Sequence, residues 1–252
     1  MSVDATWLGW SGFLLDGGKR VAVDPHWSSW TRPGELPPWD LTPLDGVVIS
    51  HGHLDHCGDV PALMHLHPHA WLAVGPDLRA WGEGLGIGAR LKVLGEGLSA
   101  DLGGVRITLL PGEHVGDTLF DQALSFARYL VQRPVSALSL LADSIRAPGG
   151  AAHAIVIDLP EGRVLHAAET LHETTDLPLW QRQIEGLHVD LLLLGVEPGE
   201  ELGASRAAAL LDADRVIAFS PHQRQREHFG VGTEVAWTRV QRNLPVERAM
   251  RG

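Results

Sequence analysis

Ser50-His51-Gly52-His53-Leu54-Asp55-His56 is the stretch of the sequence that decides the fold. It directly follows the short apolar run 47–49, so three imidazoles and a carboxylate gather where a buried strand is expected to end. Imidazole and carboxylate groups are ligands for borderline or hard divalent metals. Alternate residues of an extended chain project to one side, so His51 and His53 can reach one ion. Asp55 and His56 can reach a second ion as the chain turns into a helix. A solvated turn rich in histidine is the alternative interpretation.

Around this stretch the sequence alternates between short apolar runs and Gly-rich turns, a pattern that predicts many short strands. We expect strands at 3–8, 13–15, 21–23, 47–50, 71–74, 91–94, 105–110, 154–159, 163–167, 191–194 and 216–219. Helical patterns cover 59–66 and 204–211, and 121–145 is interpreted as two short helices broken at Pro134. Strand blocks in both halves, each followed by helices, predict two sheets packed face to face with helices outside.

Composition limits what this chain can bind. The chain has 252 residues, 44% of them hydrophobic, which suits a single domain over 1–252 with a sizeable core. Its formal net charge of −11 disfavours a nucleic-acid partner, which requires clustered positive charge. One cysteine excludes a disulfide framework, and Cys57 is expected to be a small buried side chain rather than a nucleophile. The sequence shows neither a signal peptide nor a membrane span, so we expect a cytoplasmic protein.

The motif His51-Gly52-His53-Leu54-Asp55-His56 resembles the HxHxDH signature of the metallo-β-lactamase-fold hydrolases. Residues 7–15 and 21–25 resemble the branch that holds the ascorbate-6-phosphate lactonase-like and N-acylphosphatidylethanolamine phospholipase D-like proteins. The resemblance is good over residues 3–60 and patchy afterwards. It implies an α/β fold, a four-layer αββα sandwich, here with a helical insertion around 117–148.

The same resemblance implies further metal ligands. His114 follows the strand at 105–110, and His222 follows the strand at 216–219. Glu169 stands at the end of Arg163-Val164-Leu165-His166-Ala167-Ala168-Glu169, where the family has a bridging Asp. In the implied site, one ion is bound by His51, His53 and His114. The second ion is bound by Asp55, His56 and His222, and Glu169 lies between the two ions.

Two divalent ions in such a site suggest hydrolytic chemistry. Zinc is favoured, with manganese or iron as alternatives, and ions about 3.5–4 Å apart can share a hydroxide near neutral pH. Asp55 is the predicted catalytic residue, because its uncoordinated oxygen can orient that hydroxide. Asp24 either holds a ligand histidine in position or only shapes the turn before Pro25.

Trp10 departs from the pattern of the resembling branch, which usually has histidine there. The change makes the expected mouth of the site more apolar. Trp10, Trp27, Trp30 and the neighbouring His26 are predicted to contact substrate. For the tryptophans in the loop after Pro25, covering the edge of the sheet is the alternative role.

The leading hypothesis is a dinuclear metal-dependent hydrolase acting on an ester, lactone, amide or phosphoester of a small, partly apolar molecule. The changes at Trp10 and Glu169 motivate an alternative, a metal-dependent decarboxylase, cyclase or lyase of a biosynthetic pathway. The insertion at 117–148 suits a lid, a pocket wall or a dimer contact, so a homo-oligomer stays open.

Overall fold

The structure is a computed structural model of the 252-residue chain. It describes residues 3–27, 43–112, 130–131, 138, 147–168, 170–172, 175–183, 188–223, 234–242, 244 and 247–248.

The first sheet takes its six strands in the order of the chain. They are β1 (Asp4–Gly9), β2 (Gly12–Asp16), β3 (Arg20–Val23), β4 (Gly46–Val48), β5 (Trp71–Val74) and β6 (Leu91–Val93). β1 to β3 run antiparallel through tight turns, whereas β3 to β6 run parallel. The parallel half needs crossover segments, and these carry the helices of this side.

The second sheet has seven strands in the order β13-β12-β11-β10-β9-β8-β7. They are β7 (Ser99–Asp101), β8 (Arg106–Pro111), β9 (His153–Leu159), β10 (Gly162–Ala168), β11 (His188–Gly195), β12 (Asp212–Phe219) and β13 (Glu247–Arg248). β10 to β13 are parallel, so β10, β11 and β12 all end at the same edge. The run of leucines in β11 is buried on both faces, as central parallel strands are.

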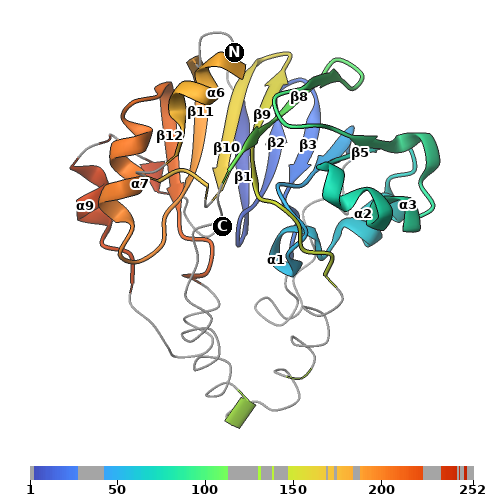
Figure 1. Ribbon diagram of the computed structural model, residues 1–252, viewed down its shortest axis with the longest axis horizontal. Helices are drawn as coiled ribbons and strands as arrows, with labels where there is room; N and C mark the ends of the chain where they lie inside the picture. Colours follow the sequence, from blue (N-terminus) through green and yellow to red (C-terminus); the bar gives the residue numbers. More distant parts are fainter. Residues whose placement is uncertain are drawn as a thin grey trace.

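Helices cover the outer face of each sheet, as Figure 1 shows. The first sheet packs on α1 (Leu54–Cys57), α2 (Val60–Leu66) and α3 (Arg79–Gly84), and the second on α6 (Leu177–Gln183), α7 (Glu201–Ala208) and α9 (Trp237–Gln241). The core between the sheets takes side chains from both, with Phe13 on one side and Ile157, Leu191 and Phe219 on the other. The order is therefore helix, sheet, sheet, helix, and the predicted αββα sandwich is confirmed.

The predicted strands all appear in the structure, most of them with slightly different ends. The sequence missed several short elements, namely α3, β7, α6, α9 and β13. The proposed insertion at 117–148 lies almost entirely outside the described residues. Among the described helices, none is long and apolar enough to cross a membrane.

Candidate metal centre

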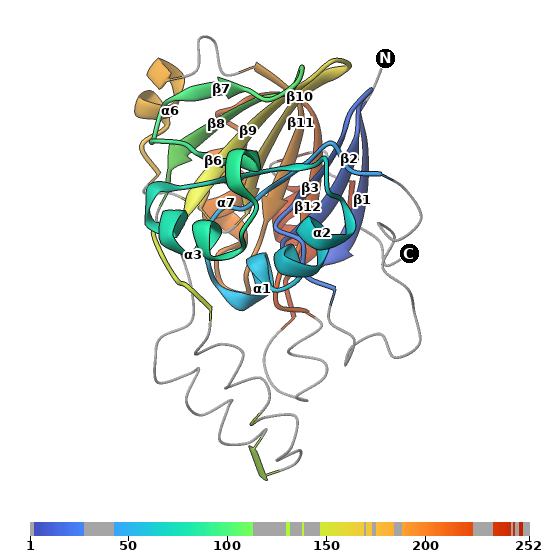
Figure 2. The same cartoon turned by 90° about the vertical axis from the view of Figure 1, so that its right-hand side faces the viewer.

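The predicted metal ligands that the structure describes lie at the edge where parallel strands of the two sheets end: His51, His53, Asp55, His56 and His222. The loop that begins at Ser50 follows β4, and His222 follows β12. Figures 1 and 2 place α1, which carries Asp55 and His56, at this edge. The carboxyl ends of parallel strands are where layered α/β folds present their ligands.

The metal loop, residues 50–56, brings two histidine rings together. His51 Nε2 lies 2.9 Å from His53 Nδ1. Gly52 exchanges two backbone hydrogen bonds with Gly149, and a Cβ at Gly52 would collide with the Gly149 carbonyl. Glycine at this position therefore lets the loop dock against the chain that leads into β9. Ligand nitrogens of a tetrahedral zinc ion lie about 3.4 Å apart, so these two rings are at hydrogen-bond distance and slightly closer than ligand spacing.

A second group of ligand atoms converges on Asp55. Its Oδ2 lies 3.4 Å from His56 Nε2 and 3.4 Å from His222 Nε2. A tetrahedral ion with ligand distances of about 2.0–2.1 Å spaces its ligand atoms about 3.4 Å apart. The Asp55 oxygen thus lies at ligand spacing from each histidine nitrogen, and a donor set of two imidazoles and a carboxylate fits the metal that the sequence implied.

Each of the two histidines in this group is held at its other nitrogen by a carboxylate. His56 Nδ1 donates to Asp24 Oδ2 at 2.9 Å. His222 Nδ1 lies 3.1 Å from Glu197 Oε1, which follows β11. A carboxylate at Nδ1 fixes the tautomer and turns Nε2 toward the ion, as is usual for histidine ligands.

The carboxylates of the centre stay ionised. Burial alone would raise the pKa of Asp24, but the charge of His56 and the hydrogen bonds from His166 and His56 lower it well below its usual value. Asp55 behaves in the same way, because His56 and His222 outweigh its burial and hold its pKa well below the usual range. Both groups therefore offer negative charge to a cation.

Backbone strain gathers around the centre. Among the described residues, three that are not glycine have positive φ: Trp10 at 51°, Asp24 at 44° and Ala168 at 43°. Trp10 packs on His222, Asp24 holds His56, and Ala168 directly precedes Glu169. Such conformations cost about 1–3 kcal/mol each and cluster at functional sites.

The aromatic residues predicted to contact substrate differ in their packing. Trp10 is buried, with its ring edge-on to His222 at 5.9 Å and tilted against His26 at 5.6 Å. Trp27 is partly buried and packs against the outer core of the first sheet, and its backbone N–H donates to Asp59. Its predicted contact with substrate stays a prediction.

Several predicted residues lie outside the described part of the chain. These are the ligand His114, the bridging Glu169 and the substrate contact Trp30. Cys57 is described and buried, and burial raises the pKa of its thiol to about 12, so it does not act as a thiolate.

Sequence reasoning missed three residues that support the centre. Glu197 holds His222; its signal was a carboxylate just past the end of the buried strand β11. His153 Nδ1 lies 3.0 Å from the Ser50 carbonyl oxygen, although the sequence suggested only an unremarkable histidine. Ser50 Oγ bridges Asp24 and His51, at 2.7 Å from Asp24 Oδ2 and 3.0 Å from His51 Nδ1.

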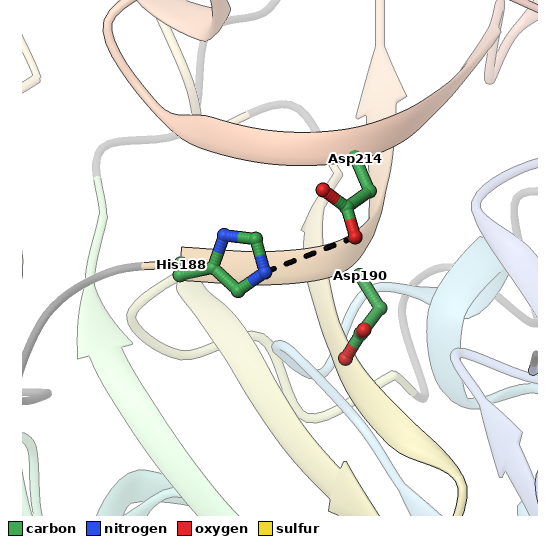
Figure 3. Close-up of side chains that lie close together, drawn as sticks. All are labelled: His188, Asp190 and Asp214. Carbon is green, nitrogen blue, oxygen red and sulfur yellow. Dashed lines mark ion pairs between the residues drawn. The ribbon is translucent and has the colours of Figure 1, made fainter. Parts of the chain in front are cut away.

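A second cluster of one histidine and two carboxylates lies at the starting ends of β11 and β12, whose other ends lead to Glu197 and His222. His188 and Asp190 open β11 and Asp214 lies early in β12, with ligand atoms within 4.8 Å of one another (Figure 3). His188 and Asp214 are largely exposed, with side chains 49% and 62% accessible. His188 Nδ1 also lies 3.0 Å from Asp212, and the backbone N–H of Arg163 donates to Asp190.

Comparison with known proteins places this geometry among metal-dependent hydrolases. The profile described as beta-lactamase superfamily domain matches residues 19–154, just over half of the chain. A UPF0173 metal-dependent hydrolase of Methanopyrus kandleri is 25% identical over 232 residues, covering 77% of this chain and 97% of that protein.

Two further similarities bear on the branch and on the fold. The N-acyl-phosphatidylethanolamine-hydrolyzing phospholipase D 1 of Caenorhabditis elegans is 34% identical over 134 residues, 44% of this chain and only 38% of that protein. The solved structure of Igni18, a metallo hydrolase of Ignicoccus hospitalis, superposes with a TM-score of 0.61 at 19% identity, covering 86% of this chain and 82% of Igni18.

Proposed function

The chain belongs to the beta-lactamase superfamily, and from that premise we propose that it is a metal-dependent hydrolase with a dinuclear site. The observation that carries the proposal is the position of Asp55 Oδ2, 3.4 Å from both His56 Nε2 and His222 Nε2. An oxygen at ligand spacing from each of two imidazole nitrogens, with both rings held from behind by carboxylates, supports a metal site here.

Seven side chains would hold the two ions. His51, His53 and His114 would bind the first, Asp55, His56 and His222 the second, and Glu169 would lie between them. Imidazole and carboxylate ligands without a thiolate suit zinc, and they also accept manganese or iron. When bound, the ions supply Lewis-acid polarisation of the scissile group and make water acidic enough to react near neutral pH.

The protein's own groups would orient the reaction. The half-buried Asp55 carboxylate is ionised and faces both imidazoles, so it can accept a hydrogen bond from the attacking water and fix its direction. Asp24 and Glu197 keep the Nε2 atoms of His56 and His222 turned inward. The chain thus fixes the orientation of His56 and His222 and places the negative charge of Asp55 between them.

We propose a small, partly apolar substrate with an ester, lactone, amide or phosphoester bond. Trp10 makes the wall beside His222 apolar, where the resembling branch has an imidazole. His26 lies against the other side of this ring. An apolar wall favours an acyl or aromatic group over a highly charged sugar phosphate.

The test is a panel of carboxylic esters, lactones, amides and phosphodiesters offered to metal-stripped and zinc-restored protein. We expect hydrolysis of one class only after restoration, and little from His53→Ala. Full activity of the stripped protein or of His53→Ala would refute the proposal. The panel is chosen to separate carbonyl from phosphoryl substrates.

Trp10 keeps one alternative in view, a non-hydrolytic enzyme of the same fold, because an indole replaces a group able to transfer protons beside His222. Turnover in oxygen-18 water separates the two. Label in the product supports hydrolysis, and unlabelled product supports decarboxylation, cyclisation or elimination.

A further inference from the structure

His166 reaches from one sheet to the other at the metal centre. It lies on β10 of the second sheet and is completely buried. Its Nε2 lies 3.0 Å from Oδ2 of Asp24, which follows β3 of the first sheet. The two residues are 142 positions apart in the chain. The contact therefore joins the sheet that carries the metal loop to the sheet that leads into Glu169.

The surroundings of His166 fix which nitrogen carries its proton. The ring stacks on Phe219 at 6.2 Å and meets Phe13 edge-on at 6.0 Å. Its Nδ1 is buried and meets no hydrogen-bonding partner among the described residues. A hydrogen on Nδ1 would be buried without an acceptor, so the neutral ring carries its hydrogen on Nε2 and donates it to Asp24.

Asp24 distributes this support to the metal ligands. Its Oδ1 accepts the backbone N–H of Ser50 at 2.7 Å, and its Oδ2 accepts hydrogen bonds from Ser50 Oγ, His56 Nδ1 and His166 Nε2. His56 is thus one hydrogen bond from Asp24, whereas His51 is reached only through Ser50 Oγ. A change in the orientation of Asp24 acts first on the His56 side of the site.

We propose that His166 is a positioning residue that anchors Asp24 from the opposite sheet and thereby aims His56 at the second metal ion. This inference rests on the proposed dinuclear site. Ser50 and His56 hold the Asp24 carboxylate from the side of the metal loop, and His166 is its hydrogen-bond donor from the opposite sheet. Loss of the His166 donor weakens binding of the second ion more than binding of the first.

His153 provides a matched control. It lies on the neighbouring strand β9, is equally buried, and also reaches the metal loop. It meets the backbone carbonyl oxygen of Ser50 at 3.0 Å rather than a carboxylate that holds a ligand. Replacing His153 disturbs the packing between the sheets without removing a donor from Asp24.

The experiment compares His166→Phe, His166→Gln and His153→Phe with the wild type by zinc titration against a competing chelator. We expect His166→Phe to lower the affinity for the second zinc ion about 10–100-fold, as loss of a supporting residue does. The affinity for the first zinc ion should fall less. His166→Gln retains an N–H donor and should recover most of the affinity. His153→Phe removes the contact with Ser50, which directly precedes His51, so it should not weaken binding of the second zinc ion more than that of the first.

Imidazole ¹⁵N spectra of the metal-free protein test the same contact without metal. The wild type should show His166 protonated at Nε2 and His56 at Nδ1, and His166→Phe should change the His56 signals. Unchanged His56 signals, or equal loss of both equivalents in His166→Phe and His153→Phe, would overturn the role of His166. A wild type that binds fewer than two ions would instead refute the dinuclear proposal, while the spectra still decide on His166.

Discussion

Two clusters of histidine and carboxylate occupy opposite ends of the same two strands. At the starting ends of β11 and β12 lie His188, Asp190 and Asp214, and past their finishing ends lie Glu197 and His222. The side chains of the first cluster are mostly exposed. At the second, His222 and His56 are largely buried, and a carboxylate lies behind each of them. The two clusters share residue types and differ in the carboxylates that hold the histidines from behind at the candidate metal centre.

The largest expected effect follows from Asp24→Ala at the buried centre. His56 and His166 would lose their common acceptor inside the protein. We expect the free energy of unfolding to fall by about 3 kcal/mol. Zinc affinity should fall about 10–100-fold. Denaturant unfolding of the metal-free protein and chelator competition measure the two effects.

Asp45→Ala is the control for that substitution. Like Asp24, Asp45 accepts hydrogen bonds from a side chain and from a backbone N–H, here those of Lys19 and Arg20. Asp45 is partly exposed, and these partners lie outside the metal centre. Asp45→Ala should lower the free energy of unfolding by about 1 kcal/mol and leave zinc affinity unchanged. Equal loss of zinc affinity in both variants would remove the special role of Asp24.

A smaller effect is expected from Glu197→Gln. The amide keeps the shape of the side chain but not the negative charge that supports His222. We expect zinc affinity to fall about tenfold, at the lower end for a supporting residue. Glu200→Gln, three residues away at the exposed start of α7, should change nothing. If the two variants retain the same zinc affinity, His222 does not depend on Glu197.

The smallest effect is expected at the exposed cluster. The double variant His188→Ala with Asp214→Asn removes the ion pair drawn in Figure 3. Because both side chains are largely exposed, stability should change by less than about 0.5 kcal/mol. Activity and bound zinc should stay at the wild-type level. Loss of a zinc equivalent in this variant would mean that the exposed cluster is also a metal site.

The same contrast explains what could be predicted from the sequence. The ligands of the metal loop are contiguous, so His51, His53, Asp55 and His56 are visible without a structure. The short continuous apolar run 191–194 in β11 also predicts a buried strand, because it is too short for a helix. Elements as short as β7 or α9 have too few residues to show a period and were missed.

Asp24 and His166 could be suspected of supporting a ligand from the sequence, but the partner that each supporting residue contacts was hidden for a different reason. His153 meets Ser50 across 103 positions and His166 meets Asp24 across 142. Such pairs depend on how the two sheets face each other, and no local pattern encodes that. His114 and Glu169 came only from the resemblance and stay predictions, because they lie outside the described residues.

The measurement that tests the central claim most directly is the number of zinc ions bound by the wild type and by Asp55→Ala, determined by elemental analysis after saturation and removal of excess metal. Asp55 Oδ2 faces both His56 and His222, so its loss should empty one site and leave the other. The account predicts two ions per wild-type chain and one per Asp55→Ala chain. Equal zinc content in the two proteins would contradict it.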